Sequence, residues 1–429
     1  MANILPFKGV YYNAGTAGDP GKLVTPPYDV ISEAEREAFY KASDKNIIRV
    51  ILGKDLEGDG EKNNRYTRAG GYLADWLEKG ILVRDPEPSM YLLEQNYVLE
   101  GGTRKTRTGF ICLVELDEYR SVLPHEGTLP GPKEDRLRLL RECRANFSPI
   151  FAFYSDGSKA AGKIISAKLG EKPFMELGEF MGVRETLWKI SAGESIEEIR
   201  KIMKDRLLYI ADGHHRFATA LNYRASMRAA NPRHNGKEPY NYTMVYITNM
   251  DDGGLSIFPT HRLVKNLKAF GGKVFLERLK EYFNVEECGS RESVMSALKK
   301  TPDNRAMGMC LASGGYFVIG LKDREVLSKV IPGRSKAYCG LNVSILHELV
   351  MKRILNVSED TLENIIYTKS PEDVFNGVEE GRYQAGFVMK PISIEELKVV
   401  VEAKELMPRK ATYFYPKLLS GLVINRMEG

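Results

Sequence analysis

An apolar run meets a polar corner in LLYIADGHHRFATAL, residues 207–221. Residues 207–211 predict a buried strand, and residues 214–229 carry apolar side chains at helical spacing. Asp212 suits the N-cap of this helix, and Gly213 lets the backbone turn tightly. We therefore expect a strand, a sharp turn and a helix, within a fold of mixed α/β class.

The start of this helix predicts an anion site. The first N–H groups of a helix lack internal partners and carry partial positive charge, so phosphate binds there. Arg216 adds a planar guanidinium suited to phosphate oxygens, and His214 and His215 can donate hydrogen bonds or move protons. Two other interpretations stay open. In the first, Asp212 only caps the helix and the two histidines are incidental surface residues. In the second, these residues bind a metal. Two adjacent histidines without an HExxH pattern disfavour such a metal site.

A second cluster of chemistry-bearing residues reads HEGTLPGPKEDR, at 125–136. Glu126 is a candidate general base for a substrate hydroxyl. Its candidate donor-binding side chains are basic or hydroxyl groups: His125, Thr128, Lys133 and Arg136. The last two are three residues apart at the start of a predicted helix, where basic residues oppose the helix dipole unless an anion binds. The alternative is a solvated loop whose charges at 133–136 form surface pairs.

Six further residues are weaker substrate-binding candidates, each on a short polar or aromatic stretch: Tyr28, Asp29, His261, Arg262, Lys410 and Lys417. The first two follow a pair of prolines that stiffens the loop, although a turn-stabilising aspartate explains them equally well. A histidine–arginine step after a short strand is more often structural. The two lysines lie among aromatic residues and could reach a phosphate, whereas a solvated basic tail is the alternative.

The composition is that of a globular protein. The 429 residues carry 62 Lys and Arg against 57 Asp and Glu, a net charge of +5, which is weak for a nucleic-acid binder. The sequence has no long apolar run typical of a transmembrane helix and no signal-peptide pattern at its start. Five widely spaced cysteines without a CxxC pair are typical of core residues in a reducing cytoplasm.

Local patterns predict several other elements. Ser32 is a good N-cap for a helix over 33–42. The β-branched run over 46–52 (NIIRVIL) predicts a strand. Ser195 and Glu198 are spaced as a capping box for a helix to residue 204.

Several motifs in the same order give this sequence a family resemblance. They are PPYDVI at 26–31, the 125–136 cluster, SPI at 148–150, DGHHR at 212–216 and the basic aromatic stretch 407–417. This pattern resembles DUF1015, a bacterial and archaeal family of unknown function. The DGHHR run also resembles the phosphate- or nucleotide-binding turn of the ParB/sulfiredoxin superfamily, which includes free-serine kinases.

The local patterns along the chain, with the core named after the resemblance, divide it into four expected segments. They are an N-terminal α/β segment (1–87), a ParB/sulfiredoxin-like catalytic core (88–265), a small α/β subdomain (266–330) and a C-terminal α/β segment packing back on the core (331–429). The implied activity is phosphorylation of free L-serine to O-phospho-L-serine, with pyrophosphate, ADP or ATP as donor.

The two clusters motivate roles for single residues in such a transfer. Gly213, His214, His215 and Arg216 would hold the transferring phosphoryl group, and Lys133 and Arg136 the remaining donor phosphate. Mg²⁺ would bridge donor oxygens near Asp212, while Glu126, or else Asp29, would take the hydroxyl proton.

The expected partners are a phosphate donor and a small hydroxyl-bearing amino acid. A membrane is not expected, nucleic acid is disfavoured, and a homodimer is allowed for. One competing hypothesis is a ParB-like nucleotide-binding switch or DNA-associated protein, although no helix-turn-helix module is evident. Another is a sulfiredoxin-like reductase, which would want a cysteine beside the turn.

Overall fold

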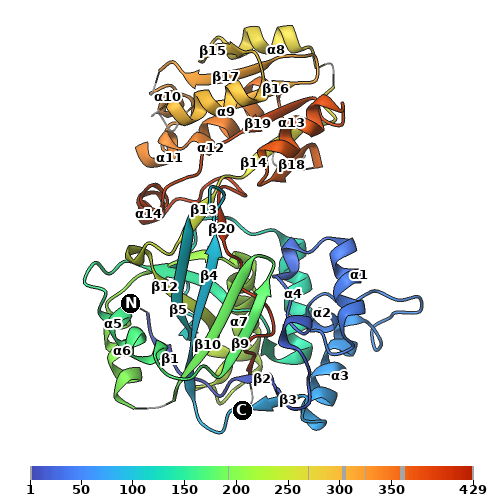
Figure 1. The fold of residues 1–429 in the computed structure, drawn as a ribbon, viewed down its shortest axis with the longest axis vertical. Helices are drawn as coiled ribbons and strands as arrows, with labels where there is room; N and C mark the ends of the chain where they lie inside the picture. The colour runs from blue at the N-terminus through green and yellow to red at the C-terminus, as the bar shows by residue number, and fades with distance from the viewer. Residues whose placement is uncertain are drawn as a thin grey trace. The chain divides into compact units, whose positions relative to one another are not determined.

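In the computed structural model, which describes residues 2–191, 193–268, 270–301, 306–323, 325–357 and 363–427, the chain forms two units. Unit 1 comprises Met1–Pro124, Thr128–Leu255 and Pro416–Gly429, and unit 2 comprises His125–Gly127 and Ser256–Tyr415. The chain therefore passes between the units four times, after Pro124, Gly127, Leu255 and Tyr415. Each unit combines a sheet with helices (Figure 1), so the expected mixed α/β class is confirmed.

Unit 1 is built on a nine-stranded sheet. Its strands lie in the order β6 (Val122–Leu123), β11 (Leu208–Asp212), β8 (Ile150–Tyr154), β12 (Tyr242–Asn249), β5 (Arg104–Glu115), β4 (Ser89–Val98), β10 (Val183–Ser191) and β9 (Met175–Phe180), with β1 (Ile4–Leu5) paired to β5. The pairs β6–β11 and β8–β12 are parallel, and the other pairs are antiparallel.

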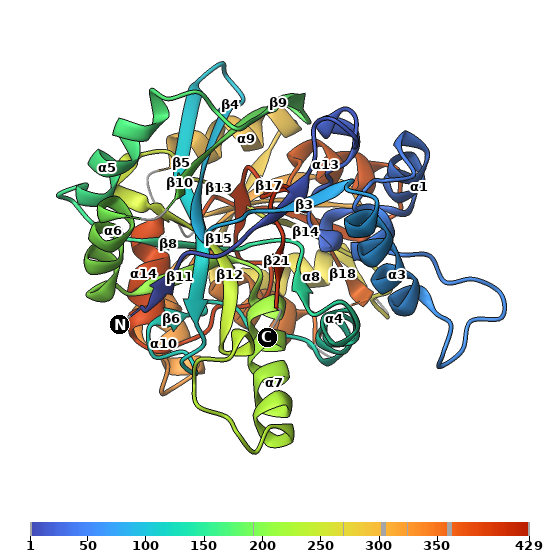
Figure 2. The same cartoon turned by 90° about the horizontal axis from the view of Figure 1, so that it is seen from below.

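Helices pack against this sheet through apolar side chains. The main core joins the strands to α5 (Ala160–Leu169), α6 (Glu194–Lys204) and α7 (His214–Ala230). A second core is formed around α2 (Ile48–Ile51), α3 (Arg65–Glu78) and α4 (Pro130–Cys143), beside the short pair β2 (Val10–Tyr12) and β3 (Leu82–Arg84). Helix α4 also packs on α7, as Figure 2 shows, and this contact brings the two sequence clusters toward each other.

One of the local secondary-structure predictions is confirmed and two are wrong. Helix α1 (Glu33–Ala42) begins after Ser32 with a complete capping box, as expected. The strand predicted over 46–52 is wrong, because Ile48–Ile51 form the helix α2. The side chain of Asn46 accepts a hydrogen bond from the amide of Ile48, and the β-branched residues pack into the core beside α3. The capping box at Ser195 is also wrong, since α6 begins at Glu194.

Unit 2 has a six-stranded antiparallel sheet. Its order is β15 (Phe283–Cys288), β17 (Tyr316–Leu321), β16 (Met307–Leu311), β19 (Ala385–Val388), β14 (His261–Val264) and β18 (Ile365–Thr368). Helices α9 (Arg291–Lys300) and α13 (Pro371–Glu379) share one apolar core with it, and α8 (Gly272–Leu279) and the wide helix Leu346–Ile354 share another. The remaining elements are β13 (Ser256–Phe258), β20 (Tyr413–Tyr415), α10 (Val326–Val330), α11 (Lys336–Gly340), α12 (Asn342–Ile345) and α14 (Ile394–Glu402).

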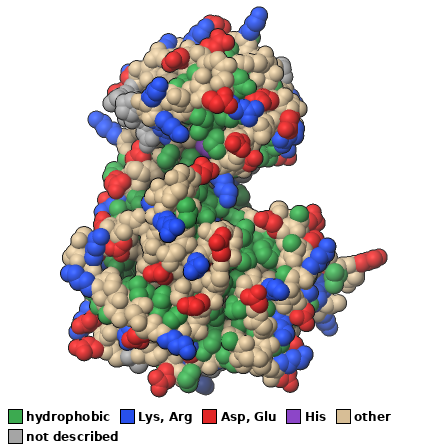
Figure 3. All heavy atoms as spheres, viewed as in Figure 1, with side chains coloured by type: hydrophobic (Ala, Val, Ile, Leu, Met, Phe, Trp, Pro, Cys, Tyr) green, Lys and Arg blue, Asp and Glu red, His purple; other side chains and the backbone are tan. Residues whose placement is uncertain are grey.

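The five cysteines are free thiols, and all but the half-buried Cys288 are buried, as the sequence predicts for core residues. Within the described ranges, no helix combines the length and apolar character needed to cross a bilayer. On the face drawn in Figure 3, acidic and basic side chains are interspersed over each unit.

Candidate functional site

The DGHHR corner lies in unit 1, where β11 ends at Asp212 and α7 begins at His214. Between them, Gly213 has φ of 96°, in the left-handed region that favours glycine. A β-carbon at Gly213 would also lie 3.0 Å from Nη2 of Arg216. Glycine therefore allows both the turn and the close approach of the Arg216 guanidinium to the backbone.

The start of α7 carries no side-chain cap. Gly213 occupies the N-cap position, so the expectation that Asp212 caps the helix is wrong. The first N–H groups, on His214, His215 and Arg216, therefore keep the anion-binding character of a helix N-terminus.

Asp212 is instead a shared counter-ion. Its Oδ2 lies 3.0 Å from Nη2 of Arg216, and its Oδ1 lies 2.9 Å from Nζ of Lys417. Burial alone would raise the pKa of the Asp212 carboxyl, but Lys417 and Arg216 hold it well below its usual range. Both oxygens bind cations in this structure, and Asp212 as a Mg²⁺ ligand stays a prediction.

The two histidines differ in their surroundings. Nε2 of His215 accepts a hydrogen bond of 3.0 Å from the backbone amide of Leu129, which precedes α4. That bond requires a neutral imidazole with its proton on Nδ1, so His215 ties the loop before α4 to α7. His214 is buried, and its charge when protonated contributes to the lowered pKa of Asp212, after the larger effects of burial, Lys417 and Arg216.

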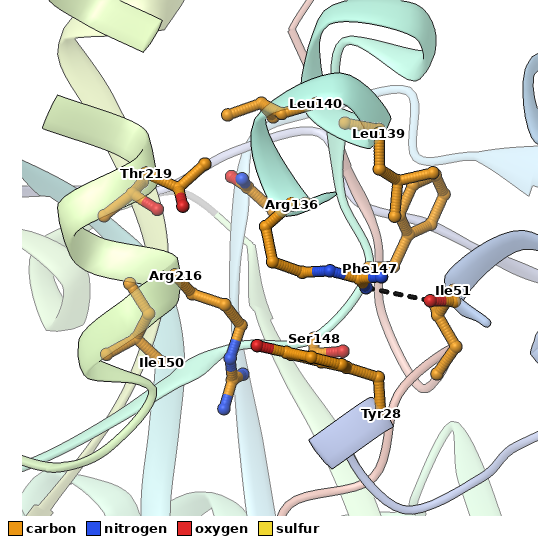
Figure 4. A pocket seen from close by; sticks show the side chains of 13 residues that line it. Tyr28, Ile51, Arg136, Leu139, Leu140, Phe147, Ser148, Ile150, Arg216 and Thr219 are labelled. Carbon is orange, nitrogen blue, oxygen red and sulfur yellow. Dashed lines mark hydrogen bonds between the residues drawn. The ribbon is translucent and has the colours of Figure 1, made fainter. Parts of the chain in front are cut away.

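A cavity of about 60 Å³ adjoins the corner. Arg216 from α7, Arg136 from α4 and Tyr28 line it together with mostly apolar side chains, among them Ile51, Leu139, Leu140, Phe147 and Ile150 (Figure 4). Arg216 is fixed by a 2.5 Å hydrogen bond from Nη1 to the carbonyl oxygen of Pro149. The two sequence clusters thus contribute one arginine each to the same cavity.

Arg136 is held on every side. Its Nε and Nη2 bond to Asp135, and its Nη1 donates to the carbonyl oxygen of Ile51 at 2.8 Å. Its guanidinium lies 3.9 Å from the centre of the Tyr28 ring, a cation–π contact. Asp135 also pairs with Arg65 at 2.7 Å, and Arg136 is buried, so this pair lies inside unit 1, whereas Glu134 forms an exposed pair with Arg138.

The other members of the second cluster divide between the units. Lys133, half-buried on α4, makes no ion pair or side-chain hydrogen bond with the described residues, and Thr128 begins a segment of unit 1. His125 and Glu126 belong to unit 2. There, Nε2 of His125 lies 2.9 Å from Oγ1 of Thr412, and Oε1 of Glu126 accepts from the amide of Lys410 at 3.1 Å.

The weaker candidates also divide. Asp29 is exposed in the short 3₁₀ turn Tyr28–Val30 of unit 1. His261 and Arg262 are buried at the start of β14 in unit 2. Nδ1 of His261 accepts from the Met389 amide, and Arg262 donates to the carbonyl oxygens of Thr260 and Lys410.

One buried network of unit 1 was not foreseen. Arg107 on β5 is fully buried; its Nε donates to Gln95 on β4 at 2.9 Å, and its Nη2 donates to the carbonyl oxygen of Pro416 at 2.6 Å. Gln95 in turn donates to Glu185 on β10 at 2.5 Å. This network anchors the backbone directly before Lys417. In the sequence, this network could have been noticed as a polar residue at an inward-facing position in each of the three strands.

Similarity to a protein family extends over most of the chain. The family model described as "Protein of unknown function (DUF1015)" matches residues 4–344. Among curated proteins, no sequence matches significantly. A solved free serine kinase in complex with AMP is 15% identical, with 73% of this chain and 91% of that chain covered and a TM-score of 0.35.

Two other solved structures are similar to the same degree. A conserved hypothetical protein from Pyrococcus furiosus is 16% identical, with 72% of this chain and 93% of that chain covered and a TM-score of 0.35. SbnI with a C-terminal truncation, from Staphylococcus aureus, is 13% identical, with 72% and 85% covered and a TM-score of 0.33. TM-scores this low do not establish a shared fold.

Proposed function

The chain belongs to the DUF1015 family, and from the corner in unit 1 we propose that it is a phosphotransferase that acts on a small hydroxyl compound. The observation that carries the proposal is the shared carboxylate of Asp212. Arg216 and Lys417 both pair with it, so two cations gather beside a helix start that no side chain caps. A phosphoryl group carries negative charge and accepts hydrogen bonds from the N–H groups of the helix start.

The resemblance of DGHHR to free-serine kinases makes L-serine the first acceptor to test. ATP, ADP and pyrophosphate are the proposed donors. In the reaction, the acceptor hydroxyl oxygen bonds to phosphorus, the bridging P–O bond of the donor breaks, and the hydroxyl proton passes to a base. Glu126 as that base remains a prediction, which E126Q tests. Mg²⁺, when bound, would neutralise donor charge.

The residues of the corner would act mainly by position and charge. The bond to Pro149 fixes the Arg216 guanidinium, whose five N–H donors are not exhausted by the bonds to Pro149 and Asp212. Lys417 and Arg216 would stabilise charge that develops on the phosphoryl oxygens. His215 is a poor candidate for proton transfer, because its Nε2 already accepts from Leu129.

The test is phosphate transfer by the full-length protein, read by ³¹P NMR with Mg²⁺, L-serine and each donor in turn. We expect O-phosphoserine from the parent protein and at least 100-fold slower formation in R216A, because a preorganised charge contact is lost. R216K, which keeps the charge, should fall between them. The control is R382A, which removes an exposed arginine of unit 2 and should match the parent.

No phosphoester with any donor and acceptor would overturn the phosphotransferase proposal. Tight nucleotide binding under the same conditions would then favour the nucleotide-binding switch.

A further inference from the structure

Lys417 reaches the DGHHR corner from the very start of a chain segment. The last segment of unit 1 begins at Pro416, so Lys417 has one residue of that segment before it. Farther along, the amide of Ser420 donates to the carbonyl oxygen of Thr25 at 2.8 Å. The backbone between these points needs a hold of its own if Nζ of Lys417 is to stay 2.9 Å from Oδ1 of Asp212.

Two buried side chains of the sheet hold that backbone. Nη2 of Arg107, on β5, donates to the carbonyl oxygen of Pro416 at 2.6 Å, and Nε2 of Gln95, on β4, donates to the carbonyl oxygen of Lys417 at 3.4 Å. Gln95 pairs with Arg107 in the strand register and accepts from its Nε at 2.9 Å. Glu185, on β10, pairs with Gln95 and accepts from it at 2.5 Å. The three strands lie side by side (Figure 1), so a row of polar side chains crosses them and ends on the start of the last segment.

The same guanidinium also contacts the strand next to Asp212. It lies 4.4 Å from the centre of the Phe151 ring, a cation–π contact. Phe151, on β8, pairs with Asp212 on β11 in the register of the sheet. Arg107 therefore contacts both the backbone that leads into Lys417 and the strand neighbour of Asp212.

The stability of the sheet alone gives little reason for a charge at this position. Arg107 is fully buried, and burial lowers the pKa of its guanidinium, so the surroundings disfavour the cation. Buried ion pairs can often be replaced by apolar side chains of similar size without loss of stability. An apolar side chain, however, has no donor for the Pro416 carbonyl oxygen. What arginine adds is a planar set of donors that reaches Gln95 and Pro416 at once.

We infer that Arg107 and Gln95 are positioning residues of the proposed phosphotransferase: they hold the backbone of Lys417 so that its ammonium group stays at Asp212. The role of Lys417 in transfer rests on the proposed function, whereas its position rests on the contacts within unit 1. Both side chains would act through Lys417 and not on a substrate.

The first test measures how firmly the Lys417 ammonium group is held, and it needs no turnover. The full-length protein is acetylated with a low dose of acetic anhydride, and peptide mass spectrometry gives the rate at each lysine. Reaction requires the ion pair with Asp212 to open. We expect Lys417 to react about tenfold faster in R107M than in the parent, because the loss of a hydrogen bond from a charged donor makes opening more frequent. Lys189, paired with Asp85 in the same unit, should react equally in both proteins.

K105M is the matched control. Lys105 lies on β5 two residues before Arg107, and its Nζ donates to the carbonyl oxygen of Leu255 at 3.1 Å. The variant thus removes the same kind of bond at another passage of the chain, and its Lys417 should react as in the parent. R107M/E185M leaves no lone charge in the sheet, which protects against a variant that fails to fold, and it should show the same faster reaction of Lys417.

Transfer kinetics give the second readout. R107M should lower kcat for O-phosphoserine formation about tenfold and leave the KM for L-serine unchanged, because a displaced Lys417 stabilises the transition state less. R107K, which keeps a cation without the planar donors, should fall between R107M and the parent.

Parent-like reactivity of Lys417 in the Arg107 variants that keep the parent's melting temperature would overturn the inference, even where transfer is observed. Equal increases at Lys417 and Lys189 would also overturn it, since they indicate a general loosening of unit 1. Faster reaction at Lys417 alone, in a protein whose parent transfers no phosphate, would overturn the proposed reaction and leave the positioning of Lys417 standing.

Discussion

The DGHHR corner of unit 1 and the His261–Arg262 step of unit 2 both place basic side chains at an end of a buried strand. Their partners differ. Arg262 donates to the carbonyl oxygens of Thr260 and Lys410, which are neutral dipoles within its own unit. Arg216 shares one carboxylate with Lys417 beside an uncapped helix. Both arginines donate to backbone carbonyls, since Arg216 also bonds to Pro149, but only Arg216 shares a carboxylate with a second cation.

The largest expected effect is that of D212A, which leaves two part-buried cations without their carboxylate. We expect the free energy of unfolding of unit 1 to fall by about 4 kcal/mol. Urea titration with pulsed hydrogen exchange and mass spectrometry reads each unit separately. Inorganic phosphate should restore part of the loss, because it binds the folded corner.

The control for D212A is D323A, which breaks an exposed pair with Lys329 and should change little. A loss under about 1 kcal/mol in D212A would contradict the shared counter-ion.

The second prediction concerns R262M. It removes the partner of two carbonyl oxygens in unit 2, and each unpaired buried group costs about 1–3 kcal/mol. We expect the free energy of unfolding to fall by about 3 kcal/mol, measured from the hydrogen exchange of peptides in unit 2. Inorganic phosphate should not restore the stability of this variant. If phosphate stabilises R262M as much as D212A, the two regions do not differ in anion binding.

The third prediction is that mild acid acts on the two units in opposite directions. In unit 2, burial and the neighbouring Arg262 lower the pKa of His261 to about 4. The unfolded state therefore binds more protons between about pH 6.5 and 4, and stability falls as the pH falls through that window. In unit 1, burial raises the pKa of Glu185 to about 7, against the effects of Gln95 and Arg107. Its contribution is fully present below about pH 4.5 and is lost as the pH rises through 7.

Each pH effect should be on the order of 2 kcal/mol, since one pKa unit corresponds to about 1.4 kcal/mol. The same exchange experiment between pH 4.5 and 7 measures both slopes. E185Q should flatten the slope in unit 1 and H261Q the slope in unit 2. If the pH dependence of unit 1 is unchanged in E185Q, a group other than Glu185 causes it.

The smallest expected effect is that of G213A. An alanine at φ of 96° costs about 1 kcal/mol of stability. G18A is the matched control, because Gly18 has φ of 95° and a β-carbon added there would meet no atom within 4 Å. Both variants should lose similar stability. Only G213A should also weaken phosphate binding, because its β-carbon meets Arg216, and equal binding in both would mean that this contact is irrelevant to the anion.

Local chemistry made the corner predictable from sequence. An apolar run followed by Asp-Gly and a helical pattern is complete within fifteen residues, so the strand, turn and helix were expected correctly. The partner of Asp212 was not predictable, because Lys417 lies 205 residues further along the chain. The N-cap expectation failed for the same reason: a distant ammonium group competes successfully for the carboxylate.

Tertiary packing explains the other misses. The run 46–52 has strand-like composition, but its side chains pack beside α3 and its backbone bonds within α2. Arg136 was expected to bind a donor phosphate, and its place in the cavity wall was not visible without the Tyr28 ring and the Ile51 carbonyl.

The four passages of the chain between the units set an order of assembly during synthesis. Unit 1 takes its last segment from Pro416 onward, so the ribosome makes residues 256–415 of unit 2 before Lys417 emerges. Until then Arg107 lacks the Pro416 carbonyl and Asp212 has only Arg216 beside it. The nascent chain can therefore form the nine-stranded sheet early, while the corner acquires its second cation only after residues 256–415 of unit 2 have been made.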